Sequence, residues 1–592
     1  MRYIASLTIA LIFCASVTAA NINVTYNINT DANKTPISKY IYGGNGQSDT
    51  FYTIHRSGGN RLTAYNWENN WSNAGADWLY ENDQFFGPST PPGKAITDFR
   101  DSCVTNHQDS IVTLQMAGYV SAPIWRQINL NTEAAPSIYF YPVVFAKGAP
   151  FCSPPGSPNT SDGVVYMDEF VNFLVYKYGY AGDPNGVKFY DLDNEPDIWS
   201  NGNKGATHPE VHVADPCCLE YKDKSVALTQ AIKNVDPNAQ MLGPVSFGFS
   251  GYLDFAGASD WTSVKGSRPW FLSYYLDEMR IASNGAGRRL LDALDVHWYP
   301  EAYDGTYVND NPDGNRIVDE IGKIKVYSRA NRTARMQAPR TLWDTSYVYP
   351  NGEVSWINRW YSSYLPIIPK LKSSINTYYP DTNLAITEYD YGGGNDVSGG
   401  IAFADVLGIF GKYEVYIANY WGEPNTYINA GFKIYRNYDG GHSTFGDMNV
   451  LASMSNKVDS SIYASVFNGN NSELHLIVIN KNIDSAITGT FNITSSQNFR
   501  SGHVWKFDNN SYNITETTSI SPISNNTFTY NIPATTVCHI VLQADPPSWD
   551  TTGPAGVPDG YVDIFDLEDF CNQWLQKYMF GHFASFAQVW GM

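Results

Sequence analysis

Residues 190–199 read Tyr-Asp-Leu-Asp-Asn-Glu-Pro-Asp-Ile-Trp, and they mark the place where a strand gives way to a loop. The apolar approach at 187–192 favours a β-strand, and Pro196 ends it because proline has no N–H to extend the hydrogen-bond ladder. Glu195 therefore lies at the carboxyl end of a predicted strand. In a barrel of alternating strands and helices, catalytic groups collect at this end, so Glu195 is a candidate acid/base. A solvated glutamate in a capped loop would give the same local pattern.

Short apolar runs alternate with helical patterns between residues 41 and 450. One helical pattern is 165–178, where apolar side chains recur on one face. Strands that alternate with helices favour parallel β-structure, and eight of them favour a closed barrel. The predicted fold class is therefore α/β, with a TIM-type (β/α)8 barrel at 41–450. The predicted strands are 41–45, 58–63, 110–117, 187–192, 239–244, 294–299, 384–389 and 415–421.

The segments on either side of the barrel have a different texture. Residues 21–29 alternate like a strand that is too early and too polar for the barrel, so 21–40 is assigned to an outlying sheet. From 451 to 543, short alternating strands are separated by Asn, Gly and Ser turns, as is typical of an antiparallel β-sandwich. Its role is to support the barrel or, as the alternative, to bind sugar. A linker at 544–557 leads to a small helical module at 558–592.

The composition restricts the class of substrate. Charged residues make up 16 % of the 592 residues and aromatic residues 15 %, so much of the surface must be uncharged, polar and aromatic. A net charge of −20 repels nucleic acid and anionic membranes and favours a neutral substrate. Sugars fit this surface, because their C–H faces stack on aromatic rings.

The first twenty residues have the layout of a secretory signal peptide: Arg2, an apolar run at 4–17 and small residues at 18–20. We therefore expect a secreted, extracellular protein, and no later apolar run is long enough to predict a membrane span. Seven cysteines include Cys14 in this segment, so six remain, and an even number in an exported chain permits up to three disulfides. Their spacing matches no zinc motif.

A second acid lies at the end of a predicted strand, in Thr387-Glu388-Tyr389. Its strand is three places after that of Glu195, so the two carboxyl groups are expected to face one cleft at the ends of strands four and seven. Two carboxyl groups about 5 to 5.5 Å apart form the machinery of a retaining glycosidase, with one acid as proton donor and the other as nucleophile. The alternative is that Glu388 is a structural partner of an arginine such as Arg61.

At this point the sequence resembles glycoside hydrolase family 44, a family of secreted endoglucanases and xyloglucanases with a barrel and a β-sandwich. The matching text extends over roughly residues 22 to 543. The resemblance implies that Glu195 is the acid/base and Glu388 the nucleophile, that the sandwich includes N-terminal residues, and that the chemistry needs no cofactor. The motifs that carry it are Gly58–Asn70, Leu192–Pro196, Asp295–Tyr299, Ile386–Asp390 and Gly392–Gly394.

Further residues at the same barrel end are candidates for substrate binding. Asn194 is placed to bond the sugar 2-hydroxyl, Tyr299 beside His297 to hold an oxygen of the nucleophile, and Arg61 to keep Glu388 ionised. Glu68 is predicted to bind a sugar hydroxyl or a structural partner. For each of these residues a packing role is the alternative. The candidate stacking platforms are Trp67, Trp71, Trp298, Trp343 and Trp421, of which about half are expected to be core residues.

The C-terminal module resembles the calcium loop of a type I dockerin, with acids at Asp559, Asp563 and Asp566. Ala555 and Val557 occupy two positions that should carry ligand oxygens, so the loop is degenerate and weak calcium binding or none is expected. The resemblance implies a cohesin-like partner and, at most, a structural calcium.

Together with the resemblance, these patterns predict a secreted retaining endo-β-1,4-glucanase that acts on cellulose-type chains or xyloglucan. The same machinery acting on mannan or xylan is the first alternative, because loops rather than the barrel set the sugar. A non-catalytic polysaccharide-binding protein at the cell surface is the alternative from a different class.

Overall fold

The computed structural model describes residues 20–45, 51–200, 206–318, 325–422, 426–544, 552 and 564–577. The predicted signal peptide, apart from Ala20, and most of the predicted linker and C-terminal module therefore lie outside the described residues. Among the helices that are described, none is long and apolar enough to cross a membrane.

Eight parallel strands close into a barrel, which confirms the predicted α/β fold class. The observed strand at Ile54–Ser57 replaces the predicted one at 58–63, where the chain forms a short helix instead. Strand pairing follows chain order around the barrel, so the carboxyl ends of all eight strands meet at one rim. The strands are β3 (Gly43–Asn45), β4 (Ile54–Ser57), β7 (Asp109–Leu114), β12 (Phe189–Leu192), β13 (Gln240–Ser246), β14 (Ala293–Trp298), β17 (Asn383–Tyr389) and β18 (Ile417–Tyr420).

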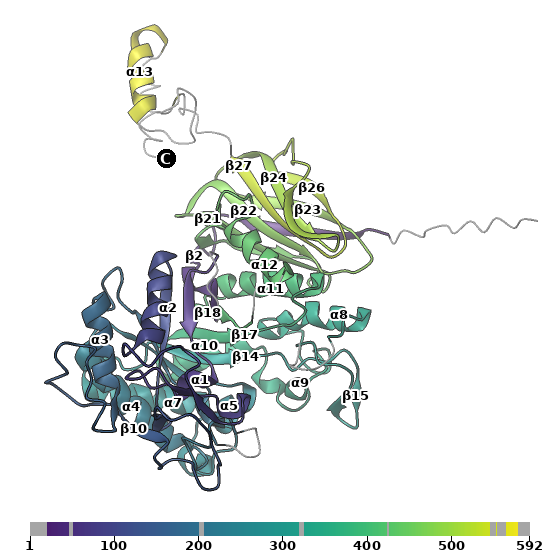
Figure 1. The fold of residues 1–592 in the computed structure, drawn as a ribbon. Coiled ribbons are helices and arrows are strands. Elements are labelled where there is room, and N and C mark those ends of the chain that lie inside the picture. Colours follow the sequence, from purple (N-terminus) through teal and green to yellow (C-terminus); the bar gives the residue numbers. More distant parts are fainter. Residues whose placement is uncertain are drawn as a thin grey trace, which may run out of the picture.

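Helices surround the barrel and complete the alternation (Figure 1). Inside the barrel, at the end opposite the rim, seven strands each contribute one buried side chain to a layer that Tyr40 joins. The helices of the barrel segment are α1 (Asn60–Thr63), α2 (Lys94–Thr105), α3 (Met167–Tyr178), α4 (Cys218–Val235), α5 (Phe249–Asp254), α6 (Trp261–Val264), α7 (Phe271–Ala286), α8 (Arg329–Gln337), α9 (Trp356–Trp360), α10 (Ile367–Tyr378), α11 (Val397–Lys412) and α12 (Thr426–Arg436). One more described helix, α13 (Ile564–Lys577), lies outside this segment.

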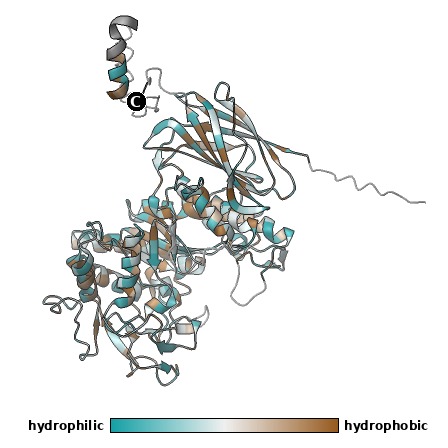
Figure 2. Ribbon diagram, turned by 45° about the horizontal axis from the view of Figure 1, so that its top comes forward, coloured by the Kyte–Doolittle hydropathy of each residue, from teal (hydrophilic) through white to brown (hydrophobic). Residues whose placement is uncertain are grey.

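Two further sheets pack on each other around a separate hydrophobic core, and we call them the two-sheet unit. Side chains along strands such as β23 alternate between buried and partly exposed. Figure 2 shows hydrophobic and hydrophilic stretches side by side on the strands of this unit. The smaller sheet has the order β20 (Leu451–Met454), β1 (Ile22–Asn29), β23 (Ile487–Thr494), β26 (Thr527–Ile532). The larger has the order β2 (Thr35–Pro36), β19 (Met448–Asn449), β21 (Ser460–Phe467), β22 (Asn470–Asn480), β27 (Thr536–Ala544), β24 (Phe499–Asp508), β25 (Ser511–Glu516).

Helices α11 and α12 join the barrel to the two-sheet unit. The hydroxyl of Tyr463 donates to Asp405 Oδ1 at 2.6 Å, and Nδ1 of His539 lies 2.7 Å from the Ile434 carbonyl oxygen. The rim itself carries small sheets built from β5 (Ser72–Asn73), β6 (Glu81–Asp83), β8 (Tyr119–Ser121), β9 (Arg126–Gln127), β10 (Phe140–Val144), β11 (Val165–Tyr166), β15 (Tyr307–Val308) and β16 (Asn311–Pro312).

The cysteines after Cys14 do not form the disulfides that their even number permits. All six described thiols, Cys103, Cys152, Cys217, Cys218, Cys538 and Cys571, are unpaired. Burial raises the pKa of Cys103 and Cys538 to about 12, so these thiols are unreactive core residues.

Candidate active site

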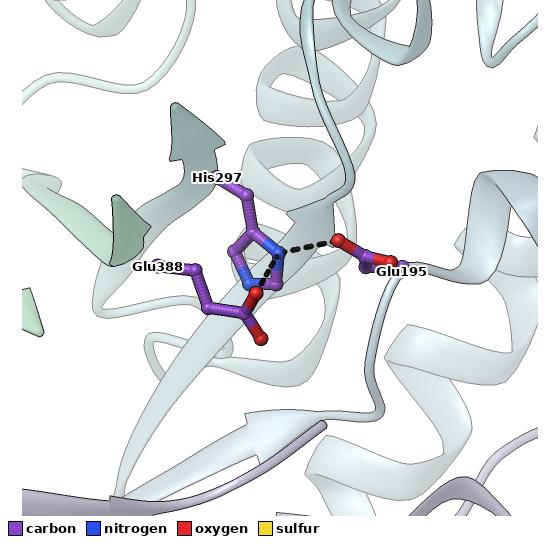
Figure 3. A group of neighbouring side chains, drawn as sticks. All are labelled: Glu195, His297 and Glu388. Carbon is purple, nitrogen blue, oxygen red and sulfur yellow. Dashed lines mark hydrogen bonds and ion pairs between the residues drawn. The ribbon is translucent and has the colours of Figure 1, made fainter. Parts of the chain in front are cut away.

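Two acids and a histidine meet at the rim of the barrel. Glu195 follows β12, Glu388 lies in β17, and His297 comes from β14, which is hydrogen-bonded to β17. Figure 3 shows the imidazole of His297 between the two carboxyl groups. One ligand-type atom from each side chain lies within 4.8 Å of those of the other two. The sequence therefore predicted the convergence of Glu195 and Glu388 correctly, because strand ends in a parallel barrel share one rim.

A strained turn presents Glu195 to the cleft. Its backbone has φ +46° and that of Asp193 has φ +68°, the left-handed region that side chains with a Cβ rarely adopt. The Asp193 carboxylate holds the turn by accepting hydrogen bonds from the backbone N–H of Met116 at 2.5 Å and from the Thr63 hydroxyl at 2.6 Å. The Glu195 N–H donates to the carbonyl of Val245 at 3.1 Å. These contacts offset a cost of about 1–3 kcal/mol for each strained residue.

Glu388 is held by two donors. Arg56 Nη1 lies 2.7 Å from Oε1, and the hydroxyl of Tyr299 donates to Oε2 at 2.8 Å. Burial raises the pKa of Glu388, whereas the charge of Arg56 and the hydrogen bonds from Arg56 and Tyr299 lower it. Both contacts favour the ionised form, which is the form that a nucleophile requires.

The net pKa of Glu388 is still raised by burial, but that of Glu195 is raised further, because the charge of Glu388 adds to its burial. Burial, followed by the negative charge of Glu388, raises the pKa of Glu195 well above the usual value. His297 Nδ1 lies 2.9 Å from Glu195 Oε1 and 3.4 Å from Glu388 Oε2. Burial and the charge of Arg56 lower the pKa of His297 well below 6.5, so the imidazole is neutral and adds no charge between the acids. The contacts of Glu388 favour its ionised form, and the surroundings of Glu195 favour its protonated form, as a nucleophile and a proton donor require.

Arg56, which sequence reasoning missed, is the central cation of the site. It is buried, and it also bonds Asp191 Oδ2 at 2.5 Å and Asn194 Oδ1 at 3.0 Å. The sequence prediction gave its role to Arg61, but Arg61 pairs with Asp83 at 2.7 Å and does not contact Glu388. The error follows from placing the second strand at 58–63. The strand in fact ends at Ser57, before the two glycines, so its buried arginine is Arg56 and not Arg61.

A cleft of about 260 Å³ opens beside Glu195. Its lining includes Trp298 and Tyr299, which the sequence indicated, and Trp356, which it did not. On the other side of the strand ends, Trp421 is 38 % exposed and its ring lies over Gly59. Trp298 is only 2 % exposed and donates to the Tyr391 hydroxyl, so it is a core residue behind the cleft. The rings of Tyr299, Trp356 and Trp421 are partly exposed and can stack on sugar faces. Asn194 reaches the same area through its contacts with Arg56 and the N–H of Gly59.

Three further predicted stacking platforms are also wrong. Trp67 is fully buried and stacks on Phe170 at 5.3 Å. Trp71 is 9 % exposed and donates to Ser89. Trp343 packs against Tyr413 and beneath Lys457, on the side of the barrel that faces the two-sheet unit. Spacing cannot separate core tryptophans from platforms, since both are apolar and follow strands.

Glu68 lies apart from the two acids. It is 4 % exposed, and burial, with the charges of Asp162 and Glu169, raises its pKa to about 8. Lys147, which bonds Glu169 at 2.8 Å, lowers it in part. Its surroundings favour the structural role over a contact with the sugar at the catalytic acids.

Glu195, His297 and Glu388 could also supply three ligands to a divalent cation. Arg56 and Tyr299, however, already engage both oxygens of Glu388, and the positive charge of Arg56 opposes a second cation there. Of the predicted calcium ligands, Asp559 and Asp563 lie outside the described residues, and Asp566 accepts a hydrogen bond from the N–H of Thr552 at 3.0 Å.

Comparison with known proteins gives three relatives that bear on this site. A curated relative, Endoglucanase A of Paenibacillus lautus, is 50 % identical over 553 residues, which are 91 % of this chain and 75 % of that protein. The Beta-mannanase/endoglucanase A of Caldicellulosiruptor saccharolyticus is 44 % identical over 529 residues, or 86 % of this chain but 38 % of the relative. The solved structure of a family 44 xyloglucanase from Paenibacillus polymyxa with xyloglucan matches with a TM-score of 0.82 and 47 % identity, over 88 % of this chain and all of that one.

A family model also matches directly. Residues 71–302, which contain Glu195 and His297, match the model of glycoside hydrolase family 44. The match, the 50 % identity with a protein of which this chain covers three quarters, and the paired acids at the rim agree. The chain is therefore a glycoside hydrolase, and it belongs to glycoside hydrolase family 44.

Proposed function

We propose that this protein is a retaining endo-β-1,4-glucanase that hydrolyses cellulose-type glucans, xyloglucan or both. The observation that carries the proposal is the pair of acids, with one carboxylate oxygen from each within 4.8 Å, of which Glu388 is bonded by Arg56 and Tyr299 and Glu195 has a pKa raised well above its usual value. A retaining enzyme needs carboxyl groups about 5–5.5 Å apart, whereas an inverting enzyme needs about 6.5–9.5 Å to admit a water. The names of the similar endoglucanase and xyloglucanase support the class of substrate.

In the first step, the ionised carboxylate of Glu388 attacks the anomeric carbon. The glycosidic C–O bond breaks as Glu195 gives its proton to the departing oxygen, and a glycosyl ester forms on Glu388. Arg56 and Tyr299 hold Glu388 in place for this attack.

In the second step, Glu195, now ionised, takes a proton from water. The hydroxide adds to the anomeric carbon and the ester bond breaks, so the product keeps the β configuration and both acids return to their first state. While the ester is present, Glu388 carries no charge, and the main charge that raises the pKa of Glu195 is absent. This loss of charge suits Glu195 to its second role as a base.

The test is an assay on carboxymethylcellulose, xyloglucan, mannan and xylan, with product anomers followed by NMR. Early β-anomers from glucan or xyloglucan, abolished in Glu388→Gln, are expected. Early α-anomers would contradict retention. The Glu195→Gln variant should keep activity on aryl glycosides with good leaving groups and respond to azide, because only the proton donor is removed. Equal loss on all leaving groups would remove the acid role from Glu195.

Mannan remains the second candidate substrate, because one relative is named a beta-mannanase as well as an endoglucanase. Activity confined to mannan or xylan would keep the two-acid chemistry and replace the glucan assignment.

We further propose that residues 1–20 direct secretion and that the C-terminal module attaches the enzyme to a cohesin-like partner. The support is the sequence pattern of Arg2 with its apolar run, and of the acids that end at Asp566. N-terminal sequencing of exported protein tests the first proposal. Calorimetric titration of the full chain with calcium, and pull-down by a cohesin with and without calcium, tests the second; no binding under either condition would reject it.

A further inference from the structure

A second hollow of about 340 Å³ lies where the barrel meets the two-sheet unit, between helix α12 and strand β25. Strand β25 is at the edge of the larger sheet. We call this hollow the junction site. Its lining residues are Asn395, Thr426, Asn429, Ala430, Lys433, Tyr512, Asn513 and Ile514.

The lining of the junction site is polar but nearly uncharged. It offers three side-chain amides, two hydroxyl groups and one ammonium group, and none of the eight described lining residues carries a carboxylate. In a chain of net charge −20 this composition is distinctive. Amides both donate and accept hydrogen bonds, as sugar hydroxyls do, and the volume falls within the roughly 300–1,000 Å³ typical of small-molecule sites.

An aromatic ring is presented at the same place. Tyr512 is 46 % exposed, and its ring meets the edge of Tyr427 at 6.0 Å. Tyr427 is itself fixed, because its hydroxyl donates to the Asp508 carbonyl at 3.1 Å. An exposed ring on a supported base, beside amides, is the combination that stacks on and hydrogen-bonds a sugar.

The junction site adjoins the rim that carries the catalytic acids. Asn395 follows β17, the strand of Glu388, and Thr426 begins the helix that follows β18 and Trp421. The N–H of Tyr427 donates to the Gly394 carbonyl at 3.1 Å, which ties the loop after β17 to α12. The junction site and the cleft are therefore both built on loops that follow strands of one barrel rim.

We propose that the junction site binds a second stretch of the neutral β-glucan chain that the cleft cleaves. The choice of glucan rests on the function proposed above; the site itself rests on its lining and its place on the rim. Binding at two points of one polymer raises the local concentration of substrate at the cleft, an advantage that an oligosaccharide too short to reach both points does not gain.

The test separates binding from catalysis by using the full chain with Glu388→Gln. Electrophoresis through gels that contain xyloglucan, hydroxyethylcellulose, mannan or xylan measures retention by each polymer. We expect Tyr512→Ala to weaken retention about three- to tenfold, the range for loss of a stacking contact. Independently, Asn513→Ala should weaken it by a similar factor, because a hydrogen bond from the amide is lost. Tyr176→Ala is the matched control, because Tyr176 is 68 % exposed on α3 and lies outside both sites. Thermal unfolding of each variant excludes a folding defect.

Kinetics with active protein provide the second measurement. The ratio of kcat/KM for polymer to kcat/KM for cellotetraose should fall in Tyr512→Ala and stay unchanged in Tyr176→Ala. Unchanged retention and an unchanged ratio in Tyr512→Ala would overturn the junction site while leaving the glucanase function intact. If the protein does not hydrolyse glucan but its retention still depends on Tyr512, the glucanase function would be overturned and the junction site would stand. Binding of inorganic phosphate by the parent that is lost in Lys433→Met, together with polymer retention that is unchanged in Tyr512→Ala and Asn513→Ala, would identify an anion site and overturn the proposal.

Discussion

The guanidinium group of Arg56 joins Glu388 Oε1, at 2.7 Å, to Asp191 Oδ2, at 2.5 Å, inside the barrel. A third nitrogen of the same group reaches Asn194 Oδ1 at 3.0 Å. One planar cation therefore fixes the nucleophile relative to the turn that carries the proton donor. Its three contacts point in fixed directions, which the ammonium group of a lysine cannot reproduce.

We expect Arg56→Lys to lower kcat about 10²- to 10³-fold while the protein still folds, because the charge remains but the contacts to Asp191, Asn194 and Glu388 cannot all be kept. The measurement is steady-state kinetics on xyloglucan with thermal unfolding as a check. Arg61→Lys is the matched control: Arg61 pairs with Asp83 away from the acids, and its activity should stay within a few-fold of the parent. Equal losses in both variants would contradict the central role of Arg56.

The charge of Glu388 should be visible in the titration of Glu195. Since burial and then Glu388 raise the pKa of Glu195, Glu388→Gln should lower that pKa while leaving it above the usual value, and carboxyl ¹³C NMR can follow both proteins. Glu301→Gln, in the same cleft, is the control.

The sign of the pH profile follows from the same pKa. Glu195 must be protonated to act as an acid, so kcat/KM of the parent should fall as pH rises through its raised pKa. The control is Glu195→Gln assayed on an activated aryl glycoside. If the fall in activity at alkaline pH persists in this variant, another group causes it.

Gly59 tests the platform formed by Trp421. A Cβ at Gly59 would lie 2.6 Å from the Trp421 ring, and the backbone has φ +88°. Gly59→Ala should therefore displace the ring and raise KM for glucan several-fold. Gly257→Ala has nearly the same strain, with φ +87°, but open space around the new atom. It should cost stability alone, so a similar KM in the two variants would refute the role of Trp421.

Glu353 should make stability depend on pH. Burial raises its pKa to about 7, and the Thr341 hydroxyl donates to it at 2.7 Å. Because the folded state holds this proton and the unfolded state does not, the unfolding free energy should fall by about 3 kcal/mol as pH rises from roughly 4.5 to 7. In Glu353→Gln this fall should vanish. The Tm of the variant minus the Tm of the parent should therefore be larger at pH 8 than at pH 5.

The control for this effect is Glu414→Gln. Glu414 is 51 % exposed and pairs with Lys372 at the surface, so its replacement should leave in place the fall that Glu353 causes. Parallel curves for the parent and Glu353→Gln would show that this carboxyl group does not hold its proton in the folded state.

The barrel could be predicted from the sequence because its signals are local. Most of the strands are buried apolar runs that end at a turn residue, and Pro196 marks the end that carries Glu195. Parallel pairing then places Glu195 and Glu388 on one rim. The strand that failed, β4, is only four residues long and contains His55 and Arg56, so its polar interior residues hid its apolar pattern.

The details of the site depend on contacts between distant residues, which periodicity does not encode. Asp193 secures the Glu195 turn through Thr63 and Met116, which lie 130 and 77 residues away in the chain. Trp67 and Trp421 both follow barrel strands, yet one is core and the other is exposed. Only the arrangement of neighbouring loops separates the two.

The position of β1 sets the order in which the molecule can be completed. Ile22 pairs with Ile487 and Tyr26 with Met454. A strand that is synthesised first therefore cannot pair until the C-terminal part of the chain has been synthesised. At about 5–20 residues per second, that delay is roughly 20–90 s, long enough for the barrel between them to fold first. The two-sheet unit cannot form autonomously from the C-terminal segment, because its smaller sheet would lack its second strand and expose an unpaired edge prone to aggregation. Segments that precede and follow the catalytic barrel in the sequence thus meet in one sheet. A fragment cut near residue 450 would separate β1 from its partner strands and leave both pieces incomplete.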